Sequence, residues 1–297
     1  MPEQLCTVGD IELCYETFGD PADPALLLTM GLATQMLGWH EDLCAELAGR
    51  GFFVIRYDNR DVGRSQRMSG RVPSTLQLLR RDKRAASYTL ADMAADAAGL
   101  LDHLEIDAAH VVGASMGGMI AQTMAALHPE RVLSLVSIMS NTGARWSGRP
   151  SLRMYSVLLT APPRDRASYM DRAVTLFSQI GSPGFERDEE DLRRIAGMSF
   201  DRGINPAGTV RQLAAIIASG DRTPLLRTIT APTLVIHGTE DRLVPPSGGR
   251  ATARAIPGAR LLMIKGMGHD LPRAVWPQLL DAIEHNATRD AGAPATA

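Results

Sequence analysis

The first half of the chain alternates between short apolar runs and longer amphipathic segments. Residues 11–18 alternate apolar and polar side chains, which predicts a strand, and the turn-rich residues 19–24 place a hairpin at the start of the sheet. Further apolar runs predict buried strands at 25–29, 52–57, 109–112 and 132–138. Amphipathic segments predict helices at 42–48, 90–104 and 119–127. Such repeated β-α-β units predict a parallel sheet with helices on both faces.

The pattern changes between residues 141 and 225. This stretch shows helical periodicity, as at 169–180 and 210–218, is interrupted by prolines and has no convincing core strand. It is too long for a plain connection, so it predicts a helical cap inserted above the sheet. Regular alternation then resumes, with strands expected at 233–237 and 259–264 and helices at 247–256 and 274–286. The predicted α/β core, a mostly parallel sheet of about eight strands, therefore comprises 1–140 and 226–286, and 287–297 is predicted to be a disordered tail.

Length and composition narrow the possible classes of protein. A chain of 297 residues suits one large α/β domain with an insertion. Its formal net charge of -2 gives no reason to expect nucleic acid or an anionic membrane as a partner. A small molecule is the expected partner, and association between copies of the chain stays open.

The cysteines and the N-terminus bear on the compartment. Cys6, Cys14 and Cys44 form no C-x-x-C pair and are odd in number, which argues against a disulfide framework and a zinc site. The first residues lack the features of a secretory signal, and no apolar run approaches the roughly 18 residues of a membrane-spanning helix. We expect a cytoplasmic protein.

The most informative motif is Gly113-Ala-Ser115-Met-Gly117, which follows the apolar run 109–112 and precedes an Ala-rich helical segment. A serine on a sharp strand-to-helix turn needs neighbours without side chains, and the two glycines supply them. The helix that begins beside Ser115 also brings free N–H groups to the place where negative charge would develop. The motif predicts a nucleophile elbow with Ser115 as the nucleophile.

A serine hydroxyl becomes a good nucleophile when a histidine removes its proton and a carboxylate orients that histidine. Both groups are expected after later strands, in the order serine, acid, histidine. Asp241 follows the strand at 233–237, and His269 follows the strand at 259–264. Glu240 competes with Asp241, which we favour because Leu243-Val-Pro after it leads into the next helix. The structural alternative for Asp241 is a turn or helix-capping residue.

The remaining histidines have more ordinary explanations in strands, helices or helix ends, with His40 the least certain because it lies near the loop after strand 25–29. No His-x-x-x-His or His-x-Glu pair suggests a metal site, and no cofactor is expected. An acyl-transfer site also needs two N–H donors for its oxyanion. We expect these from the backbone of Met116, directly after the nucleophile, and of Leu32 in the loop after strand 25–29.

Together these motifs resemble the α/β-hydrolase superfamily. Within it, residues 20–39 (DPADPALLLTMGLATQMLGW) and 56–65 (RYDNRDVGRS) resemble bacterial esterases related to aclacinomycin methylesterase, whose relatives include the cofactor-free non-haem haloperoxidases. The resemblance implies Ser115 as nucleophile, Asp241 as acid, His269 as base, and Leu32 and Met116 as oxyanion donors. It weakens through the cap, which builds most of the substrate pocket. Ester hydrolysis is therefore implied, and the polyketide substrate is not.

Three functions follow from this reading. The first is a serine carboxyl-ester hydrolase that cleaves a small to medium apolar ester through an acyl-enzyme on Ser115. The second keeps the same residues for perhydrolysis or acyl transfer, and the third is a non-catalytic ligand-binding protein on a hydrolase scaffold. The third usually involves loss of a catalytic residue, and none is lost here. The residues predicted to line an apolar pocket are Leu32, Met36, Leu37, Trp39, Met116, Met154, Leu158, Leu159 and Phe177.

Overall fold

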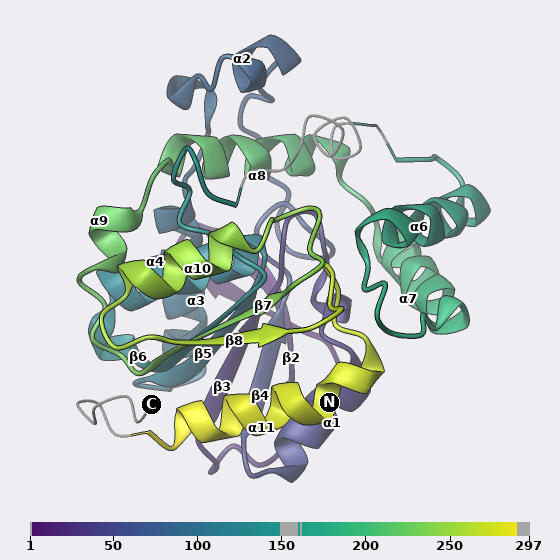
Figure 1. Ribbon diagram of the computed structural model, residues 1–297. Coiled ribbons are helices and arrows are strands. Elements are labelled where there is room, and N and C mark those ends of the chain that lie inside the picture. The colour runs from purple at the N-terminus through teal and green to yellow at the C-terminus, as the bar shows by residue number, and fades with distance from the viewer. Residues whose placement is uncertain (1, 149–159, 161, 290–297) are drawn as a thin grey trace.

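The computed structural model describes residues 2–148, 160 and 162–289 (Figure 1). Within these ranges, eight strands form one sheet in the order β1-β2-β4-β3-β5-β6-β7-β8. The strands are β1 (Gln4–Val8), β2 (Ile11–Phe18), β3 (Ala25–Thr29), β4 (Phe53–Tyr57), β5 (Ala109–Ala114), β6 (Val132–Ile138), β7 (Thr233–Gly238) and β8 (Arg260–Ile264). From β4 to β8 each neighbouring pair is parallel, which confirms the predicted mostly parallel sheet of about eight strands.

The edge of the sheet contains a hairpin that was only partly predicted. Strand β2 pairs antiparallel with both β1 and β4. The hairpin therefore turns at residues 9–10, before the alternating segment, whereas the prediction placed the turn after it. Strand β1 was missed because only two of its five residues, Cys6 and Val8, are buried. Edge strands with one face in water carry a weaker apolar pattern than central strands.

Helices cover both faces of the sheet. One face carries α3 (Leu90–His103), α4 (Met116–Leu127) and α10 (Ser247–Ala255), and the other carries α1 (Glu41–Gly49) and α11 (Trp276–Ala287) (Figure 1). Strands β3, β4, β5 and β7 are buried along their whole length, and β6 is buried except at its second residue, Leu133. The side chains on the two faces of these strands form two clusters, one against each layer of helices. Burial on both faces explains why these strands read as continuous apolar runs.

Four helices lie between β6 and β7 in the described residues. They are α6 (Arg166–Ile180), α7 (Glu189–Arg202), α8 (Pro206–Ser219) and α9 (Thr223–Leu226). Figure 1 shows α8 lying across one end of the core, with α6 and α7 projecting to the side. Helix α7 was not predicted, because charged residues dominate it and only Ala196 and Gly197 are buried. We refer to 162–219 as the cap helices; residues 149–159 and 161 lie outside the described residues. Most of the predicted tail, from 290 onward, does too.

The cap helices are tied to the core by two buried ion pairs. Arg202 of α7 lies 2.7 Å from Asp58, and Arg211 of α8 lies 2.6 Å from Asp61. Both carboxylates lie in the segment directly after β4. Burial by itself raises the pKa of Asp61, but the hydrogen bonds from Arg211 bring it below its ordinary value. Removing either arginine would leave a buried negative charge without its ion-pair partner, which typically costs about 3–5 kcal/mol.

One further helix, α2 (Thr75–Leu79), stands away from the sheet and contacts α8 (Figure 1). No helix in the described ranges has the length and apolar character needed to cross a membrane.

Candidate active site

The turn between β5 and α4 is a sharp elbow with Ser115 at its apex. Ser115 has φ 57° and ψ −119°, an uncommon conformation for a residue with a side chain. The serine N–H donates to the Ile138 carbonyl of β6 at 2.9 Å, which helps to hold this conformation. A Cβ on Gly113 would overlap the carbonyl oxygen of Gly117, and one on Gly117 would overlap that of Thr29. Glycine is therefore required at both positions by close backbone contacts.

Ser115, His269 and Asp241 form a chain of two hydrogen bonds. The Ser115 Oγ lies 3.0 Å from His269 Nε2, and His269 Nδ1 lies 2.7 Å from Asp241 Oδ2. The other carboxylate oxygen, Oδ1, accepts hydrogen bonds from the N–H groups of Leu243 and Val244 at 2.9 and 2.8 Å. Because an ionised carboxylate only accepts, His269 Nδ1 must carry the proton and Nε2 is left to accept from the serine hydroxyl. That is the tautomer a general base needs.

Asp241 and Glu240 differ in position as the sequence led us to expect. Asp241 is 3% exposed and faces His269, whereas Glu240 is exposed on the surface. A second histidine, His237, also lies beside Asp241, with Nε2 3.5 Å from Oδ2 and 2.8 Å from the Val244 carbonyl. Burial lowers the pKa of His237, so its neutral ring donates to that carbonyl. His237 was read as an ordinary strand residue, and its contact with Asp241 was not predicted.

The loop that carries His269 rests against the end of cap helix α6. The His269 N–H donates to the Ile180 carbonyl at 2.8 Å, and the Gly268 N–H donates to Ser182 Oγ at 2.8 Å. The Ser182 hydroxyl in turn donates to the carboxylate of Asp270. Burial raises the pKa of Asp270. The sequence carried no signal for Ser182, because its partners lie more than 80 residues away along the chain.

The two predicted oxyanion donors lie beside the serine. Met116 is the first residue of α4, so its N–H has no acceptor within the helix. The Leu32 N–H meets no acceptor among the described residues. The two loops pack tightly, since a Cβ on Gly31 would lie 3.0 Å from Ser115 Cβ. Two free N–H groups near one serine are the arrangement that an oxyanion hole requires.

A cavity of about 1140 Å³ opens over Ser115, between the core and the cap helices. Ser115, His269, Leu32 and Met116 lie on its wall. Apolar side chains from several elements complete much of the wall: Met119, Met139, Phe177, Leu213 and Ile216. Phe177 therefore lies where the pocket prediction put it, while the predicted Met154, Leu158 and Leu159 lie outside the described residues.

The predicted pocket residues Met36 and Trp39 are a correction. Both side chains are fully buried and are absent from the described lining of the cavity. A short 3₁₀ helix at Met36–Gly38 turns this segment inward, and Trp39 packs in the core beneath α1 and α11. Leu37 is also buried away from the cavity. An apolar residue close to an active-site loop fits a core as well as a pocket, and the sequence pattern does not separate the two.

His40 lies at the cavity wall in a charged cluster that joins core and cap. Its Nδ1 accepts from the Asp42 N–H at the start of α1, and its Nε2 lies 3.3 Å from Asp191 of α7. Arg194 and Arg273 approach the same nitrogen at 2.9 and 3.1 Å. These contacts give His40 a structural position at the boundary between cap and core.

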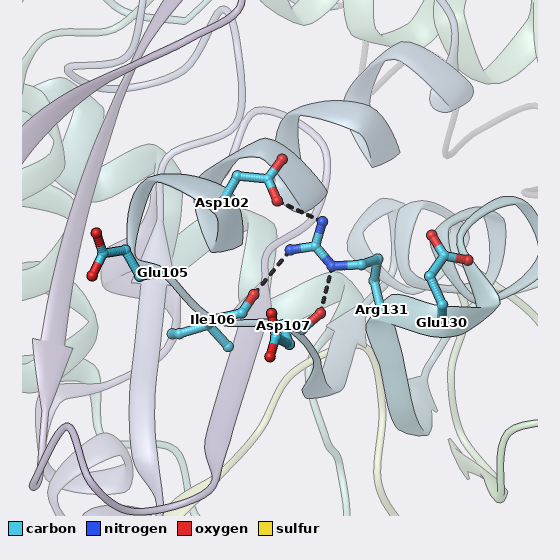
Figure 2. A pocket seen from close by; sticks show the side chains of 6 residues that line it. All are labelled: Asp102, Glu105, Ile106, Asp107, Glu130 and Arg131. Atoms are coloured by element: carbon cyan, nitrogen blue, oxygen red, sulfur yellow. Dashed lines mark hydrogen bonds and ion pairs between the residues drawn. The ribbon is translucent and has the colours of Figure 1, made fainter.

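A second depression, shown in Figure 2, lies at the opposite end of β5 from the elbow, around the segment that joins α3 to β5. At its centre Arg131 donates to the Asp102 carboxylate and to the carbonyls of Ile106 and Asp107. Its guanidinium is thus occupied in tying α3 to the segment after α4. Among the described residues, no group of three His, Cys, Asp or Glu side chains is arranged to hold a metal ion.

Comparison with known proteins agrees with this fold. The alpha/beta hydrolase fold family matches residues 24–272, and the chain belongs to this family. A rhodomycin D methylesterase of Streptomyces peucetius is 31% identical over 95% of this chain and 97% of its own length. A 3-oxoadipate enol-lactonase of Acinetobacter baylyi is 28% identical over 82% of this chain and 81% of its own. The names of these relatives support an enzyme that acts on ester bonds.

Solved structures add to the comparison. An esterase from Thermogutta terrifontis matches 97% of this chain and 100% of its own, with TM-score 0.70 and 25% identity. An enol-lactonase from Burkholderia xenovorans matches with TM-score 0.76 over 96% of this chain and 100% of its own. At 24% identity, that second likeness shows the fold alone.

Proposed function

We propose that this protein is a serine carboxyl-ester hydrolase that works through an acyl-enzyme on Ser115. The observation that carries the proposal is the chain of two hydrogen bonds from Ser115 through His269 to Asp241, at 3.0 and 2.7 Å, on the wall of a cavity. The proposed reaction needs only these residues and water, with no metal or cofactor. The esterase and lactonase names of the relatives support the same reaction class.

The proposed reaction has two halves. His269 takes the proton of the serine hydroxyl as Ser115 attacks the ester carbonyl, and the N–H groups of Leu32 and Met116 hold the oxyanion. The tetrahedral intermediate collapses, and the alcohol leaves with the proton from His269. Water then attacks the acyl-enzyme with His269 again as base, which releases the acid and restores the serine.

The cavity wall bears on the substrate. Much of it is apolar, and it includes Phe177 and Leu213 from the cap helices and Met119 from α4. We propose an ester with an apolar acyl or alcohol part. The cavity volume of about 1140 Å³ lies slightly above the usual range for pockets that bind drug-sized ligands, roughly 300–1,000 Å³. We therefore propose that the substrate range includes esters larger than the small to medium ones expected from the sequence. Charged groups on the wall, including Asp270 and Arg273, offer contacts for polar substituents.

The state of the thiols bears on the proposed compartment. All three cysteines of the chain are buried and unpaired. Unpaired thiols are usual where glutathione keeps cysteine reduced. We propose a cytoplasmic protein that acts on a small molecule.

The test of the proposed function uses p-nitrophenyl esters of graded acyl length with the wild-type protein and Ser115→Ala. We expect hydrolysis by the wild type and a loss of kcat of at least about 10⁴-fold in the variant, because nucleophile and base act as a unit. A fluorophosphonate probe should label the wild type and not the variant. Near wild-type turnover by Ser115→Ala would refute the proposal. Product analysis with added hydrogen peroxide decides between water and peroxide as the second substrate. A dominant peracid product would identify perhydrolysis, instead of hydrolysis, as the main reaction.

A further inference from the structure

The oxyanion loop, residues 30–36 after β3, is held in an unusual conformation. Ala33, directly after the donor residue Leu32, has φ 57°. A left-handed backbone is uncommon for a residue with a Cβ and persists when its surroundings impose it. The Ala33 N–H lies in the peptide that joins Leu32 to Ala33, and the Leu32 N–H lies in the preceding peptide. The two peptides share the Leu32 Cα, so a group that holds the Ala33 N–H restrains the Leu32 backbone and, through it, the direction of the Leu32 N–H.

The Ala33 N–H is held by a side chain from the cap. It donates to Gln212 Oε1 of α8 at 2.9 Å. The amide nitrogen of Gln212 donates to the Arg60 carbonyl, also at 2.9 Å. Gln212 is completely buried, and turning its amide around would set donor against donor and acceptor against acceptor. The carboxamide therefore has one satisfied orientation, which bridges the oxyanion loop and the segment after β4.

The core and the cap both hold this loop, and at its end the Met36 N–H donates to Asp58 Oδ1 of the core at 2.8 Å. Asn59 of the core donates to the Met30 carbonyl at 2.9 Å, at the start of the loop. At its end, the side chain of Gln35 donates to the carbonyls of Ser199 and Gly203, at 2.8 and 3.0 Å, by the C-terminal end of α7. Arg202 donates to the same Gln35 side chain. In the middle of the loop, the Thr34 N–H donates to the Gly31 carbonyl at 3.2 Å, and Gln212 of α8 holds the Ala33 N–H from outside the loop.

We propose that Gln212 is a positioning residue for the oxyanion hole, so that the cap takes part in setting the catalytic geometry as well as in shaping the pocket. The inference rests on the proposed function, because it needs Leu32 to serve as an oxyanion donor. Such donors stabilise charge that develops in the transition state. A misplaced Leu32 N–H should therefore lower kcat and leave KM nearly unchanged.

The test replaces Gln212 by Met, which keeps the length and burial of the side chain and removes both hydrogen bonds. Removing an oxyanion donor outright costs about 10²–10³ in kcat, and displacing one should cost less, about 10–100-fold. KM for p-nitrophenyl butyrate should change by less than about threefold. Affinity for an alkyl boronic acid, whose tetrahedral adduct with Ser115 occupies the oxyanion hole, should fall with kcat, while affinity for butyrate should not.

Two further variants test which features of the Gln212 side chain are needed to bridge Ala33 and Arg60. Gln212→Glu keeps an oxygen for the Ala33 N–H, and burial favours its protonated form, which also donates to the Arg60 carbonyl. It should recover most of the wild-type kcat. Gln212→Asn keeps a carboxamide but is one methylene too short to bridge both groups, so it should resemble the methionine variant. If circular dichroism shows that Gln212→Met does not fold, Gln212→Asn replaces it in the test.

Asn286→Leu is the matched control. Asn286 is a second buried carboxamide, 2% exposed, and it donates to the carbonyls of Leu135 and Pro232, far from the loop. Replacing Asn286 should lower the melting temperature because two buried hydrogen bonds are lost. It should keep kcat within about twofold, because neither bond touches the loop or Ser115. An unchanged kcat in Gln212→Met, a rise of KM alone, or an equal loss of kcat in Asn286→Leu would overturn the inference. If Ser115→Ala is inactive, any of these results refutes the role of Gln212 and leaves the proposed function intact. If Ser115→Ala is active, the proposed function itself is refuted.

Discussion

Replacing Asp241 by Asn probes the direction of the hydrogen bonds in the site. The two side chains have nearly the same shape, so the change alters donors and acceptors more than packing. Asp241 Oδ1 accepts from the N–H groups of Leu243 and Val244, and Oδ2 accepts from His269 Nδ1. An asparagine has one oxygen, and its amide group must occupy the other place.

The backbone decides which way that asparagine lies. If its NH₂ group faced Leu243 and Val244, one partly buried and one buried N–H donor would lose their acceptor, at up to about 1–3 kcal/mol each. The oxygen should therefore stay on the backbone, and the NH₂ group should face His269 Nδ1. His269 then accepts at Nδ1 and carries its proton on Nε2, where it cannot take the serine proton. In a serine protease the same substitution lowers kcat about 10⁴-fold, which corresponds to about 5.4 kcal/mol.

The assay is steady-state hydrolysis of p-nitrophenyl butyrate near pH 7.5, with Glu240→Gln as the matched control. We expect a fall of about 10⁴-fold in kcat for Asp241→Asn, with a melting temperature close to that of the wild type. Glu240 is exposed, so the control should stay within about twofold. If Asp241→Asn kept more than about a tenth of the activity, or if Glu240→Gln lost it instead, the tautomer argument would be refuted.

Three more predictions concern stability and reactivity. Gly113→Ala should destabilise the fold by about 3 kcal/mol or more in urea unfolding, because its Cβ overlaps the Gly117 carbonyl; a change below about 1 kcal/mol would contradict the close contact. Burial lowers the pKa of His110, so the unfolded chain takes up a proton below about pH 6.5 while the folded one does not. The free energy of unfolding should therefore decrease as pH falls from about 6.5 toward 5, and less steeply in His110→Gln; parallel pH profiles would argue against this. Burial raises the pKa of the cysteine thiols, to about 12 for Cys44, so a disulfide reagent at about pH 8 should label the native protein far more slowly than the protein in guanidinium; equal rates would contradict it. The thiols are those of Cys6, Cys14 and Cys44.

The parts of the molecule that could be predicted are those in which the position of a segment in the fold restricts the residue types along that segment. The central strands are buried on both faces, so they appear as apolar runs, and the predicted 25–29 and 132–138 coincide with β3 and β6. The glycines around Ser115 reveal the elbow because their hydrogen atoms are required by close backbone contacts. Asp241 and His269 were found because side chains after parallel strands meet at one edge of the sheet.

Other features depended on contacts that leave no local trace. Met36 and Trp39 looked like pocket residues and lie in the core, because a single 3₁₀ turn decides which way they face. Helix α7 was missed since it buries little apolar surface.

The amino-acid sequence was therefore sufficient for the central strands, the elbow and the candidate catalytic residues, since burial and backbone crowding constrain residue type directly. Only the tertiary structure showed how the cap holds those groups. Gln212 meets Ala33 across 179 residues, and Ser182 meets Gly268 across 86. A single polar side chain at either position is compatible with a solvent-exposed helix or loop, and its partner is set by how two distant segments pack. The geometry of the oxyanion loop and of the histidine loop thus rests on long-range hydrogen bonds between cap and core.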